Sequence, residues 1–318
     1  MADDGHYDID GAFRKDDLVG PSYEPTFAGA LSFMRRRFSY DVSGADMAIL
    51  GIPFDVAVTN RPGARFGPRA VRAASVILDN DPQFPFGADI FEKLKLVDTG
   101  DCPIDHSHTE RMPELIYRCA KRILDEDVHL LSLGGDHFVT WPLLQAHAEK
   151  FGAPLAYIQF DAHQDTWDDD GTSISHGNFV TRAVNQGIID PEKSIQVGIR
   201  THAPADYGIK IVDGFAVDDM SPNQIADLIK ERVGDAPTYL TFDIDCLDPA
   251  YAPGTGTPVA GGPSSAKMLA VLRQLGSLDL IGGDVVEVAP AYDHAEVTAI
   301  AASTVAMFYV ALIAEKMK

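Results

Sequence analysis

The stretch Tyr157-Ile158-Gln159-Phe160-Asp161-Ala162-His163-Gln164-Asp165 decides the fold class. The apolar run that ends at Phe160 changes abruptly into acid, imidazole and acid at alternate positions. In a strand, side chains two apart point to the same face, roughly 6.6 Å apart along the chain. We therefore expect Asp161, His163 and Asp165 to converge on one side where the strand ends. Polar ligands beside an apolar core are costly without a compensating cation, so the pattern indicates a divalent metal ion.

Short apolar segments alternate with helical patterns along most of the chain. This order is typical of an α/β fold with a parallel sheet that is covered by helices on both faces. Ligands bind such sheets at the carboxyl ends of the strands. Expected strands span 47–52, 94–97, 128–133, 155–160, 194–199, 208–212, 238–242 and 280–286; expected helices span 69–78, 110–126, 140–150, 178–185, 221–233, 264–275 and 297–314.

Other predicted strand ends carry the same kind of side chain. Gly134-Gly135-Asp136-His137 follows one strand, Asp243-Ile244-Asp245 ends another, and Glu287 follows a third. Two imidazoles and four carboxylates exceed what one ion with an open coordination position usually takes, and they suit two ions that share carboxylates. Oxygen-rich ligands with two histidines fit Mn²⁺ better than a structural zinc. The sequence therefore predicts two Mn²⁺ per subunit, held by His137, Asp161, His163, Asp165, Asp243 and Asp245.

Each motif alone has a plainer reading. An Asp-x-His or Asp-x-Asp after a strand can equally cap a helix or form a turn. The coincidence of several such motifs at strand ends of one parallel sheet is what favours a metal site.

Composition limits the partners and the compartment. The 318 residues are 46% hydrophobic, enough for a large core, and 26 basic against 47 acidic residues give a net charge of −21. This charge argues against nucleic acid and anionic membranes as partners. Three scattered cysteines form no disulfide framework, which favours a reducing cytoplasm. Residues 1–40 are expected to form an acidic N-terminal arm without a signal peptide, and residues 41–318 a single catalytic domain.

The segment 297–314 has no charged residue and just reaches the length of a membrane span. It is rich in alanine, includes Thr298, Ser303 and Thr304, and stands alone. We expect a helix buried against the sheet or a subunit neighbour, with a membrane span as the alternative.

The three metal motifs resemble the signatures of the ureohydrolase family, which includes arginases, agmatinases, guanidinobutyrases and formiminoglutamases. The likeness covers nearly the whole chain after about residue 40. Several stretches are similar to bacterial agmatinases in particular, namely Gly135-Asp136-His137-Phe138-Val139-Thr140, residues 240–248, Ala252-Pro253-Gly254-Thr255-Gly256-Thr257-Pro258 and Asp284-Val285-Val286-Glu287-Val288-Ala289-Pro290-Ala291-Tyr292-Asp293.

The resemblance implies a three-layer α/β/α sandwich around a mostly parallel, roughly eight-stranded sheet, in a homotrimer or homohexamer. It also implies that His176 is a proton shuttle and that Glu287 holds the guanidinium group of the substrate. A metal-bridging hydroxide would attack the guanidinium carbon, and Asp165 would protonate the leaving amine, giving urea. Gln164 departs from the family pattern, in which Thr or Ser stands at this position.

The choice of substrate depends on loops. The segment 166–175 contains Asp168, Asp169 and Asp170 and no basic residue. A carboxylate at the mouth of the site, with Asp168 as the candidate, would favour the distal ammonium of agmatine over the carboxylate of 4-guanidinobutyrate. These aspartates can also simply form a solvated loop. Hydrolysis of another guanidino compound, a metal-binding regulatory protein without turnover, and a metal-dependent deacylase remain as alternatives.

Overall fold

The computed structural model describes residues 10–13, 25–78, 82–87 and 89–317. Within these residues, a single nine-stranded sheet runs through the molecule in the order β1-β3-β2-β4-β9-β8-β5-β6-β7, and every strand pair is parallel. All carboxyl ends therefore lie at one edge of the sheet. The strands are β1 (Arg37–Phe38), β2 (Met47–Gly51), β3 (Leu96–Asp101), β4 (His129–Leu133), β5 (Leu155–Phe160), β6 (Ile189–Ile199), β7 (Lys210–Asp213), β8 (Thr238–Asp243) and β9 (Leu280–Val286).

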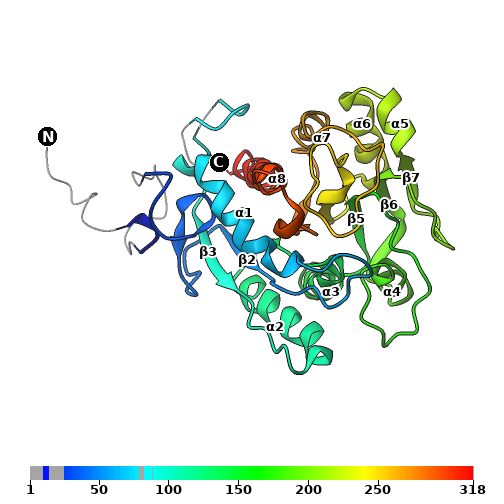
Figure 1. Ribbon diagram of the computed structural model, residues 1–318, viewed down its shortest axis with the longest axis horizontal. Helices are drawn as coiled ribbons and strands as arrows, with labels where there is room; N and C mark the ends of the chain where they lie inside the picture. Colours follow the sequence, from blue (N-terminus) through cyan, green and yellow to red (C-terminus); the bar gives the residue numbers. More distant parts are fainter. Residues whose placement is uncertain (1–9, 14–24, 79–81, 88, 318) are drawn as a thin grey trace, which may run out of the picture.

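Helices cover both faces of this sheet and make three layers, as predicted (Figure 1). Alternate residues of each strand face opposite layers: in β2, Met47 and Ile49 pack into one core cluster, while Ala48 and Leu50 pack into the other. One layer holds α2 (Met112–Leu124), α3 (Thr140–Phe151) and α4 (Phe179–Asn185); the other holds α1 (Gly67–Ser75), α5 (Gly214–Asp219), α6 (Pro222–Val233), α7 (Ser265–Leu272) and α8 (Val297–Ala314).

Helix α8 is a core element. Fifteen of its residues are buried, which explains why the segment carries no charge on any face. Among the residues that the structure describes, it is the one helix long and apolar enough to cross a membrane, and 83% of its apolar window is buried inside the protein. The expectation of a helix packed against the sheet is confirmed.

Some residues of the expected N-terminal arm pair with the sheet and pack against it. Strand β1 pairs with β3 at the edge of the sheet. It is the ninth strand, in addition to the eight that the sequence predicts. Phe33 and Met34 are fully buried, with their backbone N–H groups donating to Asp98 (2.7 Å) and Ser75 (2.8 Å). Residues 33–38 of the expected arm thus contact the sheet and α1. Residues 1–9 and 14–24 of that arm lie outside the described residues.

Candidate metal centre

The four middle strands of the sheet, β4, β9, β8 and β5, end at one site. Each contributes a predicted residue: His137 follows β4, Glu287 follows β9, Asp243 ends β8 and Asp161 follows β5. The expectation that the strand ends would bring these side chains into one crevice is confirmed.

A tight turn positions His137. The Asp136 carboxylate accepts hydrogen bonds from Phe138 N (3.2 Å) and Ala57 N (2.8 Å), and so caps the short 3₁₀ helix that carries His137. Gly135 is required here, because a Cβ at this position would lie 1.6 Å from the carbonyl oxygen of Phe54. The turn therefore fixes the imidazole at the end of β4.

The three polar side chains after β5 come together, but not because they alternate along a strand. The strand ends at Phe160, and the following residues form a loop. The Asp161 carboxylate folds back to accept from His163 N at 2.6 Å, and Asp165 adopts a left-handed backbone with φ of 53°. Our prediction that a continuing strand would align these side chains is wrong, although the side chains do meet.

The motif after β8 is arranged by a similar cap. Asp243 accepts from Asp245 N at 2.8 Å and starts a short 3₁₀ helix, Ile244–Cys246. The Asp245 carboxylate accepts from Ala162 N at 3.1 Å and so ties this turn to the β5 loop. Cys246 is fully buried, with its sulfur 3.6 Å from the carbonyl oxygen of Val197, so it packs inside the protein.

Two groups of potential ligands form around the two imidazoles. His137 Nδ1 lies 3.0 Å from a carboxylate oxygen of Asp161, 3.1 Å from one of Asp165 and 3.1 Å from one of Asp243. None of these contacts has the geometry of a hydrogen bond, so the nitrogen has no hydrogen-bond partner. His163 Nδ1 lies 3.4 Å from Asp161 and 3.1 Å from Asp245. The sets His137–Asp161–Asp243 and Asp161–His163–Asp245 could each hold a metal ion, and they share Asp161.

This geometry fits two divalent cations. A buried nitrogen without a partner, aimed at three carboxylates, is the arrangement expected of a metal ligand. The other ring nitrogen of His137 lies 2.9 Å from Thr241 Oγ1, which in turn donates to the Asp284 carboxylate at 2.5 Å. Such a contact fixes which nitrogen faces the metal, as metal-binding histidines require.

Repulsion among these carboxylates supports the same conclusion. Burial and the neighbouring charge of Asp161 raise the pKa of Asp165 to about 6. Burial, followed by the charges of Asp245 and Asp161, also raises the pKa of Asp243. The carboxylates thus share a buried space in which their charges are mutually unfavourable, and divalent cations would relieve that cost.

His176 and Glu287 form a pair beside these ligands. His176 Nδ1 lies 2.9 Å from Glu287 Oε1, and His176 Nε2 lies 2.8 Å from Thr59 Oγ1. The pKa of His176 is about 9, because the hydrogen bond and charge of Glu287 outweigh the burial that lowers it. Glu287 Oε1 also accepts from His137 N (2.9 Å), whereas its Oε2 is buried without any donor. Like Asp165, Glu287 has a positive φ, here 64°.

A cavity of 330 Å³ opens onto this centre. Three residues of its wall were not singled out from the sequence: Thr59, Trp167 and Thr257, of which Thr257 donates to Asp245 at 3.1 Å. Thr257 lies inside the stretch 252–258, whose resemblance to agmatinases is the one sequence feature that could have pointed to it. The wall consists of Thr59, His163, Asp165, Trp167, Ser175, His176, Gly177, Asp243 and Thr257.

The three aspartates of the neighbouring loop serve other purposes. Asp169 pairs with Arg182 in a buried contact at 2.5 Å, and Asp170 accepts from the backbone of Thr172 and Ser173. Asp168 is exposed and is not among the residues that line the cavity. The structure therefore does not bring Asp168 to the site, contrary to the prediction that it would face the substrate.

Gln164 also points away from the centre. Its side-chain oxygen accepts from Ala203 N at 3.0 Å, and its backbone carbonyl accepts from Gln196 at 2.7 Å. The departure from the family pattern at this position therefore supports the 203 loop and leaves the cavity wall unchanged.

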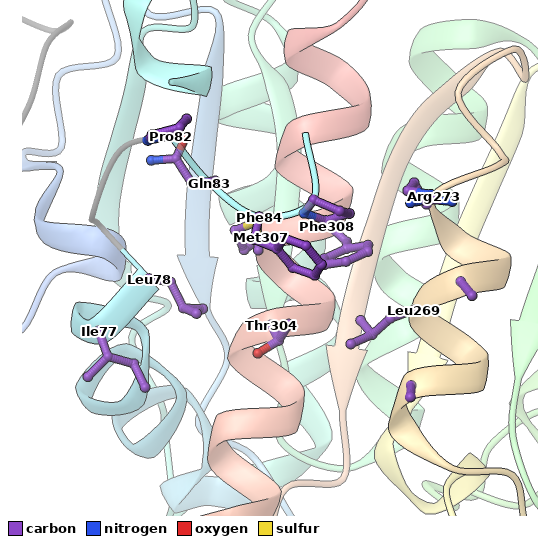
Figure 2. Close-up of a pocket in the computed structure, with 13 residues that line it drawn as sticks. Ile77, Leu78, Pro82, Gln83, Phe84, Leu269, Arg273, Thr304, Met307 and Phe308 are labelled. Carbon is purple, nitrogen blue, oxygen red and sulfur yellow. The ribbon is translucent and has the colours of Figure 1, made fainter. Parts of the chain in front are cut away.

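A larger cavity, of 570 Å³, lies elsewhere, between α7, α8 and residues 77–78 and 82–85 (Figure 2). The described part of its lining is mainly apolar, with Phe84, Met307 and Phe308 close together and Arg273 as the one charged residue there. The described residues that line it include no acid and no histidine, so they offer no ligands for the predicted chemistry.

The fold and this centre define the class of the protein: an α/β protein with a candidate binuclear metal site at the carboxyl edge of a parallel sheet. The chain belongs to the arginase family, whose model matches residues 45–311. This family is metal-dependent, and the expected resemblance is confirmed.

Several relatives are similar over nearly their full length. An agmatinase from Chromobacterium violaceum is 51% identical over 96% of both chains. The crystal structure of a hypothetical agmatinase from Burkholderia thailandensis has a TM-score of 0.95 at 51% identity, covering 96% of this chain and 98% of that one. Proclavaminate amidinohydrolase from Streptomyces clavuligerus has a TM-score of 0.85 at 35% identity, with coverage of 92% and 99%.

Proposed function

We propose that the protein hydrolyses agmatine to putrescine and urea. The observation that carries this proposal is the buried Oε2 of Glu287, which has no donor and lies beside the candidate metal centre. A buried carboxylate oxygen without a donor is costly, and a planar guanidinium offers the paired N–H groups that would satisfy it. The agmatinases that resemble this chain at 44–51% identity support the same reaction.

The metal ligands of this proposal are His137, Asp161, His163, Asp165, Asp243 and Asp245. Two Mn²⁺ ions bound there would supply a water of lowered pKa for attack on the guanidinium carbon. Glu287 would hold the guanidinium by its free oxygen. His176 keeps Glu287 in place through the 2.9 Å contact with Oε1, so that Oε2 remains available to the substrate.

Proton transfer is assigned to Asp165 and His176. The leaving amine needs a proton, and the Asp165 carboxylate lines the cavity beside the other proposed metal ligands, where it would take up the proton of the attacking water and pass it to the amine. His176 lines the cavity and connects to Thr59 at its opposite nitrogen. It can therefore exchange protons between the site and the solvent side of the cavity.

Preference for agmatine follows from the cavity wall. Among the described residues, the lining includes Asp165 and Asp243 and no lysine or arginine, and its two histidines, His163 and His176, already lie against Asp245 and Glu287. A distal ammonium also suits the negative charge of the whole chain. This argument replaces Asp168 as the source of the preference.

We also propose a cytoplasmic homotrimer or homohexamer. The three cysteines are free thiols, in keeping with a reducing compartment. The assembly rests on the family resemblance, and light scattering coupled to size-exclusion chromatography measures it directly.

Urea release by the manganese-loaded protein tests the function. Agmatine, 4-guanidinobutyrate and arginine are offered in parallel at equal concentrations. We expect a strong preference for agmatine. Turnover of 4-guanidinobutyrate instead would retain the reaction but contradict the argument from the cavity wall, and no urea from any of them would contradict the proposed function.

A further inference from the structure

Two of the three cysteines meet in space although they lie 17 residues apart. Cys102 directly follows β3, and Cys119 lies in α2. The Cys102 thiol donates to Cys119 Sγ at 3.0 Å. Spacing along the sequence gave no sign of this pair, because the two residues come from different elements.

The two thiols differ in accessibility and in acidity. Cys102 is 2% exposed, whereas Cys119 is half-buried. The hydrogen bond from Cys102 lowers the pKa of Cys119, and the positive charge of Arg122 adds to this effect. The same contact, together with burial, raises the pKa of Cys102. Cys119 is thus the more accessible and more nucleophilic member of the pair.

We propose that Cys102 and Cys119 form a reversible intramolecular disulfide when the protein meets a hydroperoxide. The Cys119 thiolate attacks one peroxide oxygen, the O–O bond breaks, and Cys119 becomes a sulfenic acid while the peroxide is reduced to an alcohol or water. The Cys102 sulfur then attacks the Cys119 sulfur, its proton leaves with the hydroxyl group as water, and the S–S bond forms. A small thiol reverses the reaction by exchange.

The geometry requires little movement. A disulfide bond is about 2.05 Å long, so the sulfurs need to approach by roughly 1 Å. Cys102 follows the last residue of β3 and keeps one backbone hydrogen bond to β2, from its N–H to Gly51 O (2.8 Å), and the loop that begins at Pro103 comes directly after it. Within the described residues, Cys246 has no sulfur neighbour and packs against the backbone of Val197, so it is the natural control.

The test uses the full-length, manganese-loaded protein with hydrogen peroxide as the oxidant. Peptide mapping of the oxidised wild-type protein is expected to show a Cys102–Cys119 crosslink, a mass decrease of about 2 Da and full reversal by dithiothreitol. Cys246→Ser is expected to behave like the wild-type protein.

Single substitutions distinguish Cys119, which reacts with the peroxide, from Cys102, which closes the disulfide. In Cys102→Ser, Cys119 is expected to be trapped as a sulfenic acid when dimedone is present, and to gain about 32 Da as the sulfinic acid when dimedone is absent. In Cys119→Ser, Cys102 is expected to stay reduced at the same peroxide dose. A wild-type protein that keeps its thiols at the dose that oxidises Cys119 in Cys102→Ser would overturn the proposal, as would a crosslink between chains or one that involves Cys246. The wild-type result does not depend on how the variants fold.

Discussion

His176 and Glu287 lie 2.9 Å apart at the edge of the metal centre, and this contact leaves one carboxylate oxygen of Glu287 buried without a donor. The fold thus brings together two side chains that are 111 positions apart in the sequence. The imidazole contacts the carboxylate at Oε1, and under the proposed function the free Oε2 would favour a cationic, planar group over a neutral one.

Glu287→Gln tests this arrangement directly. The amide keeps the size of the side chain and an acceptor for His137 N, but it loses the charge that pairs with a guanidinium. We expect the rate of urea formation from agmatine to fall roughly a hundredfold or more, while the metal content stays unchanged. The measurement is steady-state urea release, with metal analysis and Tm as controls. Near-normal activity with intact metal binding would mean that the free oxygen has no role.

Asp161 is common to both candidate ligand sets, and this predicts how metal is lost in variants. Asp161→Asn is expected to lower the bound metal to well below one ion per chain. His163→Asn removes a ligand from one set only, so it should retain about one ion per chain. Elemental analysis after equilibrium dialysis against Mn²⁺ measures both. Equal losses in the two variants would contradict two separate sites.

Metal removal is expected to lower the thermal stability of the wild-type protein. Without cations, the buried carboxylates repel one another, as the raised pKa of Asp165 and of Asp243 shows. A ligand that binds only the folded state also stabilises it by mass action. Treatment with a chelator should reduce Tm by several degrees, and added Mn²⁺ should restore it. Asp161→Asn serves as the control, because its Tm should respond little to either treatment.

The position of Asp168 leads to a prediction opposite to the one drawn from the sequence. The residue is exposed and outside the cavity wall, whereas Trp167 beside it lines the cavity. We expect Asp168→Asn to change KM for agmatine by less than about twofold. Trp167→Ala should raise KM, because it removes part of the wall. A large rise in KM for Asp168→Asn alone would restore this residue to the binding site.

The sequence predicted the site better than it predicted the local structure that builds it. Asp161, His163 and Asp165 do meet, but through a backbone cap and a left-handed Asp165 that no periodicity reveals. Strand β1 was missed because two residues at a sheet edge carry no pattern. Helix α5 was missed because it is six residues long and exposes Phe215. The contact between Cys102 and Cys119 depends on how β3 and α2 pack, which is decided only by the whole fold.

A buried histidine outside the active site predicts a pH dependence of stability. His147 is fully buried; its Nδ1 contacts the carbonyl of Leu143 at 2.7 Å, and its Nε2 has no partner. Burial lowers its pKa from 6.5 to about 4. Above pH 6.5 the residue is neutral in both states. As the pH falls toward 4, the unfolded chain takes up a proton that the folded chain excludes, so stability is lost by up to roughly 3 kcal/mol.

His147→Gln cannot titrate, so it should flatten this part of the pH profile. The measurement is the free energy of unfolding by urea at several values between pH 4.5 and 8, with the wild-type protein alongside. The difference between the two should shrink steadily as the pH falls, whatever the cost of the substitution at pH 8. His294→Gln, at an exposed position, is the matched control and should keep the wild-type slope. A His147→Gln profile parallel to that of the wild-type protein would show that His147 takes up its proton equally well in both states.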